Sequence, residues 1–214
     1  MTARQFSVKQ AQQEAKNTYR RGEVLVNIKL TRKETTMTKF ETLLQQNLFS
    51  EDPETRQSAA EALEEKYGAE IHGIEMDPTL RFAHHARGCT VIASKIEANV
   101  VIYQNVTIGS NQRFNHTTNQ WENLGNPVIC EHVIVADGAK ILGPIIIGAN
   151  SVIGAGAIIT KDVPANSVAF GVNQVKPRDP NYGLVFAEPL LSRDDTIAAC
   201  QALIKRAAAS ESQR

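Results

Sequence analysis

Aliphatic residues recur at every sixth position through the middle of this 214-residue chain. The main series is Ile129, Val135, Ile141, Ile147, Ile153 and Ile159, and an earlier series with the same spacing is Ile96, Ile102 and Ile108. An α-helix repeats every 3.6 residues and a β-strand every two, so neither element produces a period of six. For all of these except Ile108, the position four residues after the aliphatic is again small or branched: Val100, Val106, Val133, Ala139, Ile145, Ser151, Ala157 and Val163. This spacing predicts a structure built of repeated short units.

Three six-residue units make one triangular coil of a parallel β-helix, and successive coils stack on one another. In this interpretation the aliphatic residue points into the prism, and the small residue after it lets the chain turn a corner. Such small residues are Gly109, Ala136, Gly148 and Gly154. Eleven of the thirteen glycines lie between positions 68 and 171, where corners are expected. The spacing therefore predicts a mainly β fold, with a parallel β-helix over residues 70–178.

One interruption breaks the phase of the repeat. Ile108 and Ile129 are 21 positions apart, which is not a multiple of six, so part of residues 110–126 must leave the coil as a loop. Long loops on rigid scaffolds commonly carry function. The loop is polar and contains one Trp, one Phe, one Arg and one His, which suits a lid over a polar ligand. An inert excursion is the alternative.

The segments flanking the repeat are predicted to be helical. Two short helices in residues 37–69 are indicated by apolar residues at helical spacing: Phe40, Leu43, Leu44 and Leu48, then Ala59, Ala60, Leu63 and Tyr67. Ser50 is the expected N-cap of the second helix and Gly68 its C-terminal cap, and the pair is interpreted as a packing or oligomerisation element. Residues 179–214 are predicted to form a tail and a helix. The apolar face of that helix is expected to dock on a coil or a neighbouring subunit: Ile197, Cys200, Leu203 and Ile204.

Residues 1–36 form a separate basic leader, with eight Lys and Arg against three Glu. An organellar transit peptide is one interpretation, although residues 24–30 look more like a short strand. A vector-derived or start-site extension before Met37 is another. No role is assigned to this leader.

The charge composition argues against several classes of partner. The chain has 23 basic and 23 acidic residues, so it lacks the basic surplus typical of proteins that bind nucleic acids or anionic membranes. No apolar run approaches 18 residues and the first residues have no apolar signal core, so a cytoplasmic protein without a membrane span is expected. Three cysteines without a CxxC pair predict neither a disulfide framework nor a zinc finger. Cys89 and Cys130 are expected to fill the prism.

Several short motifs in the repeat region share a pattern. They are Ile71-His72, His85-Ala86-Arg87-Gly88, Val106-Thr107-Ile108-Gly109, the run from Asp137 to Ile145, Ile153-Gly154-Ala155-Gly156-Ala157 and Lys161-Asp162-Val163-Pro164. Together they resemble the serine O-acetyltransferase branch of the hexapeptide-repeat acyltransferases, over about residues 70–178. The resemblance implies a left-handed β-helix, acetyl-CoA as acyl donor and a homotrimer, with a dimer of trimers left open.

The resemblance also implies a catalytic pair. His85 matches the family's catalytic histidine by its spacing from Ile71 and by the His-x-x-Gly pattern. Acetyl transfer to an alcohol needs a base for the hydroxyl proton, and an imidazole with a pKa near 6.5 suits that task. Glu70 stands where the family has an Asp that orients the histidine. The alternatives are a structural histidine at a corner and a solvated carboxylate.

The acceptor positions depart from the family pattern. His84 replaces an Asp that holds the substrate amino group, and Gly125-Asn126-Pro127 replaces an Arg-His-Pro that contacts the serine carboxylate and hydroxyl. Arg113 and His116 in the loop could supply replacements. We therefore expect the acceptor site (His84, Arg113, His116, Asn126) to be remodelled toward a serine-like small molecule that differs from serine in charge.

The donor positions keep the pattern. Small residues match the wall along which the family binds the pantetheine arm, and two lysines are candidate partners of the diphosphate. The expected donor-binding residues are Ala136, Gly154, Ala155, Gly156, Lys161 and Lys176.

Two other classes of function remain open at this point. Related β-helix trimers are zinc carbonic anhydrases, which bind zinc with three histidines, two of them five residues apart. The five histidines of this chain include no such pair, so no metal is predicted. The altered acceptor positions also fit an acyltransferase-fold protein that acts as an assembly or regulatory partner without catalysis.

Overall fold

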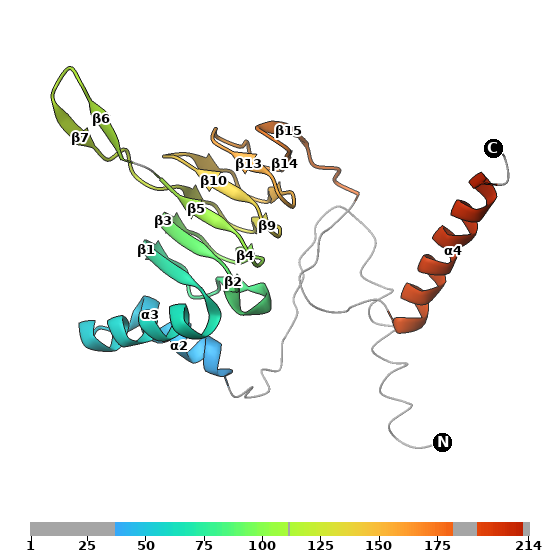
Figure 1. Ribbon diagram of the computed structural model, residues 1–214, viewed down its shortest axis with the longest axis horizontal. Helices are drawn as coiled ribbons and strands as arrows, with labels where there is room; N and C mark the ends of the chain where they lie inside the picture. The colour runs from blue at the N-terminus through green and yellow to red at the C-terminus, as the bar shows by residue number, and fades with distance from the viewer. Residues whose placement is uncertain (1–36, 111, 182–191, 212–214) are drawn as a thin grey trace, which may run out of the picture. The chain divides into compact units, whose positions relative to one another are not determined.

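The computed structural model describes residues 37–110, 112–181 and 192–211, with the side chains of the last helix described to residue 207. Within these residues two helices come first, α2 (Lys39–Phe49) and α3 (Pro53–Tyr67), and a third, α4 (Arg193–Glu211), comes last (Figure 1). Between them lie short strands and one 3-10 turn, η1 (Ala83–Ala86). The predicted leader, residues 1–36, lies outside the described residues.

The strands form the three faces of a prism. The first face contains the early halves of β1 (Glu70–Met76) and β3 (Thr90–Ile96), followed by β5 (Thr107–Gly109), β10 (Lys140–Leu142) and β13 (Ile158–Ile159). The second contains the late halves of β1 and β3, then β8 (Val128–Ile129) and β11 (Ile146–Ile147).

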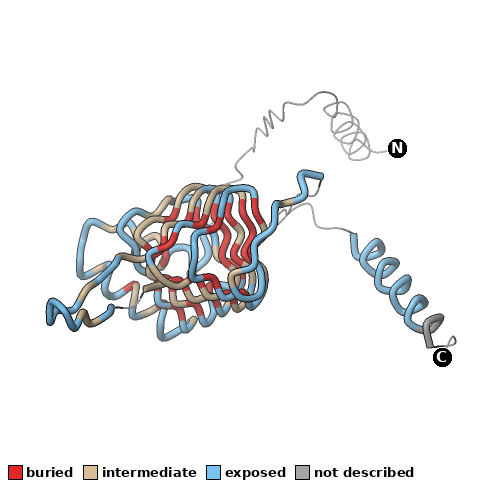
Figure 2. The backbone as a smooth tube through the Cα atoms, turned by 90° about the horizontal axis from the view of Figure 1, so that it is seen from above, coloured by how far each residue is buried: buried red, intermediate tan, exposed pale blue. Residues whose placement is uncertain are grey.

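The third face is made of β2 (Arg81–Phe82), β4 (Val101–Ile102), β9 (Ile134–Val135), β12 (Val152–Ile153) and β14 (Ser167–Phe170). All these pairs are parallel, and only β15 (Gln174–Pro177) closes the last coil as an antiparallel strand on β14. Seen from above, the coils stack around an interior lined with buried residues (Figure 2). The predicted β-helix, with helices before it and after it in the sequence, is confirmed; it has about five turns.

The six-residue period builds the core directly. All nine aliphatic residues of the two series are 1% exposed or less. For every aliphatic except Ile108, where the chain leaves the coil, the residue four positions later is buried as well, Ile145 being the most exposed of these at 7%. Each hexapeptide therefore places two side chains in the prism. Burying a Val or Ile side chain contributes about 1.5–3 kcal/mol, so the stacked layers supply most of the hydrophobic stabilisation of the coil.

The corners differ from the prediction. The residue with left-handed backbone is the third after the aliphatic and not the one directly following it: Asn99, Asn105, His132, Gly138, Asn150 and Gly156. Asn tolerates this conformation better than other residues with a Cβ, which explains its frequency here. The small residue after the aliphatic serves close packing instead: a Cβ on Gly148 would lie 2.4 Å from the backbone nitrogen of Ala165 in the next coil.

The two N-terminal helices pack on the first coil. Phe40, Leu44 and Leu63 belong to the same buried cluster as the prism residues. Asp52, not Ser50, is the N-cap of α3, because its carboxylate accepts from two backbone N–H groups at the start of the helix. Gly68 ends that helix with φ = +61°, as predicted.

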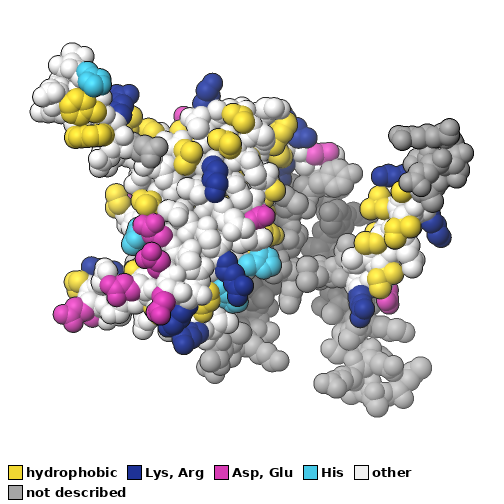
Figure 3. All heavy atoms as spheres, in the orientation of Figure 1, with side chains coloured by type: hydrophobic (Ala, Val, Ile, Leu, Met, Phe, Trp, Pro, Cys, Tyr) yellow, Lys and Arg dark blue, Asp and Glu magenta, His cyan; other side chains and the backbone are white. Residues whose placement is uncertain are grey.

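The C-terminal helix exposes its apolar side chains. Ile197, Leu203 and Ile204 are 43%, 56% and 68% exposed, and apolar side chains are visible on the surface of α4 (Figure 3). The predicted docking face of this helix is therefore not covered by the other described residues. In the described part of the chain, none of the helices has the length and apolar character of a membrane span.

Candidate active site

The two adjacent histidines sit on an unusual turn between β2 and β3. His84, His85 and Ala86 have φ angles of +51°, +59° and +53°, three consecutive non-glycine residues in the left-handed region. This conformation costs roughly 1–2 kcal/mol per residue with a Cβ, and such strain persists only where the surroundings enforce it. Both histidines are exposed, whereas Ala83 and Ala86 are buried and anchor the turn.

Backbone hydrogen bonds hold this turn in place. The N–H of Cys89 donates to the carbonyl oxygen of Ala86 (3.0 Å), and the N–H of Gly88 donates to that of Tyr67 (3.4 Å). The N–H of Asn105 donates to the carbonyl oxygen of Arg87 (2.8 Å), which ties the turn to the next corner.

His85 lies against two aromatic rings from the helices. Its ring centroid is 5.5 Å from that of Phe40 and 5.7 Å from that of Tyr67. Sequence reasoning assigned Phe40 and Tyr67 to helix packing alone and missed these contacts. The apolar periodicity that identified them as core residues could not show which loop they would meet.

Glu70, the predicted partner of His85, makes its ionic contact elsewhere. Its Oε1 lies 3.8 Å from Nε2 of His72, and both side chains are about half exposed. In the described part of the chain, no hydrogen bond joins Glu70 to His85. His84 lies beside Tyr103, with ring centroids 6.5 Å apart.

The four small residues of the predicted donor site lie at the corner that carries the histidines. Ala136 follows β9, and Gly154, Ala155 and Gly156 follow β12; both connections lead from the third face to the first, as the His84–His85 turn does. Ala136 and Gly154 are half-buried, while Ala155 and Gly156 are exposed. The structure thus places the candidate base and the small donor residues on one edge of the prism.

Successive turns of this edge are joined by hydrogen bonds. The N–H of Gly138 donates to the carbonyl oxygen of Gln104 (3.1 Å), and that of Gly156 to the carbonyl oxygen of Asp137 (2.8 Å). The Asn105 amide donates to the Asp137 carboxylate (3.1 Å).

The cations near this edge differ from those predicted. Lys161 follows β13 at another corner, and Lys176 lies on β15, with its Nζ 5.6 Å above the Phe170 ring. Lys140 instead reaches the edge, where its ammonium donates to the carbonyl oxygen of Asn105 (3.2 Å) and to Oγ1 of Thr107 (2.9 Å). It belongs to one of the motifs that carry the family resemblance, which is the signal that could have identified it.

The segment predicted to leave the coil contains an antiparallel hairpin, β6 (Arg113–Asn115) and β7 (Gln120–Glu122). The hairpin projects from the coil after β5 (Figure 1). The Asn115 amide (2.6 Å) and Arg113 Nε (2.8 Å) donate to the Glu122 carboxylate, and these bonds lower the pKa of that carboxyl group. Arg113, a predicted acceptor residue, is therefore already paired with an acid inside the hairpin.

The same hairpin carries an aromatic group. Phe114 contacts His116, with centroids 5.1 Å apart, and Trp121, with centroids 5.4 Å apart. Trp121 is 69% exposed. His116, the second predicted acceptor residue of the loop, is thus part of an exposed aromatic cluster.

Asn126 lies where the hairpin rejoins the coil. Its carbonyl oxygen accepts from Oγ of Ser94 (2.8 Å), and its N–H donates to the same hydroxyl (3.2 Å). Asn126 lies at the corner between the first and second faces, whereas His84 and His85 lie at the corner between the third and first faces. Within one chain, the structure does not bring the loop residues and the histidine pair to the same corner.

The two thiols of the coil, Cys89 and Cys130, lack the properties of nucleophiles. Burial raises the pKa of the Cys89 thiol, whose Sγ donates to the carbonyl oxygen of Tyr103 (3.2 Å), and desolvation raises that of half-buried Cys130 as well. The placement of Cys89 in the prism is confirmed by its 1% exposure. Across residues 37–110, 112–181 and 192–211, no three His, Cys, Asp or Glu side chains are grouped as a metal site requires.

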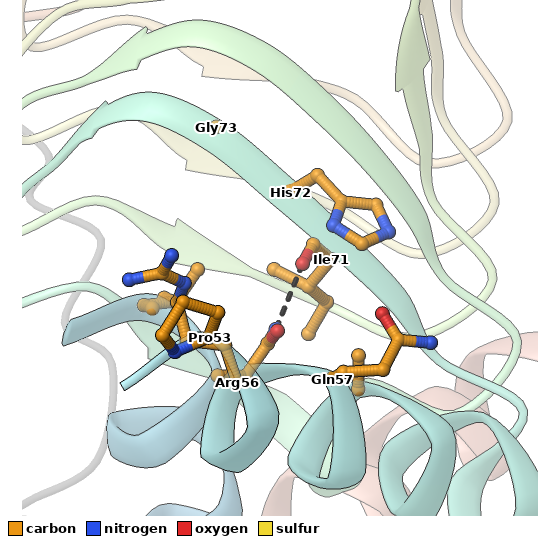
Figure 4. A pocket seen from close by; sticks show the side chains of 9 residues that line it. Pro53, Arg56, Gln57, Ile71, His72 and Gly73 are labelled. Carbon is orange, nitrogen blue, oxygen red and sulfur yellow. Dashed lines mark hydrogen bonds between the residues drawn. The ribbon is translucent and has the colours of Figure 1, made fainter. Parts of the chain in front are cut away.

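A groove of about 530 Å³ lies between the helices and β1. Figure 4 shows Arg56 and Gln57 of α3 facing Ile71, His72 and Gly73 of β1, with the Asn47 amide donating to the carbonyl oxygen of Ile71 (2.8 Å). None of the predicted site residues lines this groove.

The fold and the repeat define the chain as a hexapeptide-repeat protein. A family model described as bacterial transferase hexapeptide (six repeats) matches residues 126–161. The serine acetyltransferase of Bacillus pumilus is 33% identical over 106 residues, which cover 49% of this chain and 46% of the relative. The serine acetyltransferase of Mycobacterium tuberculosis is 34% identical over 116 residues, which cover 54% and 48%.

A crystal structure of Neisseria gonorrhoeae serine acetyltransferase in complex with serine covers 58% of this chain and 48% of its own, with 27% identity and a TM-score of 0.47. The chain spans about half the length of the curated relatives it matches. Over that half the chain is similar to serine acetyltransferases, as the motifs indicated.

Proposed function

We propose that this protein transfers an acetyl group from acetyl-CoA to the hydroxyl group of a serine-like small molecule, with His85 as general base. The observation that carries the proposal is that the histidine turn and the small donor residues share one edge of the β-helix, in a chain similar to serine acetyltransferases. His85 is exposed and can therefore meet a substrate.

The chemistry follows from an imidazole beside an acceptor hydroxyl. The neutral ring takes the hydroxyl proton as the oxygen attacks the thioester carbonyl, and a carbon–oxygen bond forms. The tetrahedral intermediate then collapses, the carbon–sulfur bond breaks, and the imidazolium returns the proton to the leaving CoA thiolate. The same histidine takes up the proton and returns it, so the proposed reaction requires no metal.

The donor would lie along the edge that carries Ala136, Gly154, Ala155 and Gly156. Small side chains leave backbone accessible there, as close approach of a pantetheine arm requires. Lys140, which reaches this edge, adds a positive charge to the candidate set. Lys161 and Lys176 remain candidate partners of the diphosphate only if a second subunit brings them near.

The acceptor should differ from serine in charge. His84 stands where the family has a carboxylate, and Arg113 is already paired with Glu122. Each buried charge-assisted contact is worth about 1.5–3 kcal/mol, so two missing contacts lower the specificity for free serine by about 10²- to 10⁴-fold. A panel of amino alcohols and substituted amino acids, compared with serine by kcat/KM, tests this. Serine as the best substrate would contradict it.

The site is proposed to need two subunits of a homotrimer. The loop residues and the histidine pair lie at different corners of one chain, so a neighbouring copy would have to bring a loop to the histidine edge. Sedimentation equilibrium at micromolar concentration tests this proposal: a trimer is expected, and a monomer would remove the shared site.

Release of free thiol from acetyl-CoA tests the activity itself. His85→Ala should lower turnover by about 10²- to 10⁴-fold, the contribution of a general base, with little change in CoA affinity. Wild-type turnover in this variant would assign His85 a structural role. Absence of thiol release by the wild-type protein across the whole panel would favour the assembly-partner alternative.

A further inference from the structure

We propose that the N-terminal helix pair positions His85 for catalysis, with Tyr67 and Phe40 as the positioning residues. The inference rests on the proposed role of His85 as base. It assigns to two residues of the helices a function beyond packing, because they fix the imidazole that receives the proton.

The first observation concerns the contacts of the His85 side chain. In the described residues its side chain makes two ring contacts, with Phe40 at 5.5 Å and an interplanar angle of 67°, and with Tyr67 at 5.7 Å and 34°. Within that same part of the chain, the His85 side chain has no hydrogen bond or ion pair. The Glu70 carboxylate, its predicted partner, contacts His72 instead. The orientation of the imidazole therefore depends on these two aromatic rings.

The rings are themselves fixed. Phe40 is 4% exposed and packs edge-on against Tyr67 (5.2 Å, 80°) and against Phe82 (6.3 Å, 81°). Edge-to-face pairs of this kind add about 0.5–1.5 kcal/mol beyond burial and limit ring rotation. The imidazole is thus the exposed member of a four-ring cluster whose other members pack on or within the core.

Tyr67 also holds the backbone of the histidine turn. Its carbonyl oxygen accepts from the N–H of Gly88, three residues after His85. One residue at the end of α3 therefore contacts both the ring and the strained backbone that presents it. A base must lie within hydrogen-bond reach of the proton it removes, and a displacement of about 1 Å can cost 10²-fold in rate.

The test is a double-mutant cycle measured by thiol release. Tyr67→Leu keeps an apolar side chain and removes the ring, and should lower kcat by about 10- to 100-fold with the KM for acetyl-CoA unchanged. Tyr67→Phe keeps the ring and should retain kcat within about twofold. In the His85→Ala background, Tyr67→Leu should have no further effect, because a positioning residue acts only through the group it positions.

Leu63→Ala is the matched control. Leu63 lies one turn earlier on the same helix and is fully buried, but it is not one of the ring contacts of His85. Leu63→Ala should destabilise the protein while leaving kcat unchanged at a temperature where the variant is folded. A fall in kcat equal to that of Tyr67→Leu would show that both act through general stability and would overturn the inference.

A spectroscopic readout is independent of turnover. The imidazole proton resonances of His85, assigned by their loss in His85→Ala, should shift in Tyr67→Leu, where a ring current is removed, and not in Leu63→Ala. Unchanged kcat and resonances in Tyr67→Leu would refute the positioning role. If His85→Ala itself keeps wild-type turnover, it is instead the proposed function that fails.

Discussion

Replacing Gly88 with Ala tests how the histidine turn is packed on the next corner of the coil. Gly88 has φ = +66°, and a Cβ placed there would lie 2.6 Å from Oδ1 of Asn105. The added methyl group therefore meets two obstacles, an unfavourable backbone conformation and a neighbouring side chain. The two can be separated because other positions carry only one of them.

The expected loss follows from these two terms. A left-handed conformation costs a residue with a Cβ roughly 1–2 kcal/mol. The Asn105 side chain can rotate away, but it then loses its bond to the Asp137 carboxylate, at 3.1 Å, and a net hydrogen bond is worth about 0.5–1.5 kcal/mol. Gly88→Ala should therefore lower the free energy of unfolding by about 1.5–3.5 kcal/mol in total.

Urea unfolding of three variants checks the reasoning. Gly156→Ala is the control, because Gly156 has φ = +65° and an added Cβ would have no neighbour within 4 Å in the described part of the chain. It should show the backbone cost alone, about 1–2 kcal/mol. In an Asn105→Gly background, Gly88→Ala should cost no more than that control. Equal losses for Gly88→Ala and Gly156→Ala in the wild-type background would refute the steric part of the argument.

Three further results are expected. Ile141→Ala should lower the free energy of unfolding by about 2–5 kcal/mol in urea titrations, because its side chain is fully buried between coils. The amide and guanidinium that donate to the Glu122 carboxylate lower its pKa, so their contribution to the hairpin is complete above the ordinary value of 4.5 and is lost as the pH falls through the lowered pKa. The single tryptophan, Trp121, should report this as a fluorescence change below pH 4.5 that Glu122→Gln abolishes. A thiol reagent at pH 8 should modify exposed Cys200 rapidly and buried Cys89 only on unfolding, since burial raises the pKa of Cys89; fast reaction of both would contradict the burial.

Much of the fold is a local property of this chain. The six-residue spacing of residues such as Ile141, Ile147 and Ile153 determined the coil, because each repeat packs only on its neighbours and one rule applies at every layer. The break in phase after Ile108 located the excursion for the same reason. The family resemblance, through the spacing from Ile71 and the His-x-x-Gly pattern, is what made His85 the candidate base.

The tertiary structure determined the contacts between residues that are far apart in the sequence. Phe40 and Tyr67 meet His85 only because the helices fold back under the first coil, and no periodicity in the helices specifies that partner. The pairing of Arg113 with Glu122 likewise depends on the register of the hairpin, which the polar composition of the loop does not determine. Sequence spacing determines layers that repeat, whereas a site assembled from a helix pair, a strained turn and a loop depends on how those distinct parts pack together.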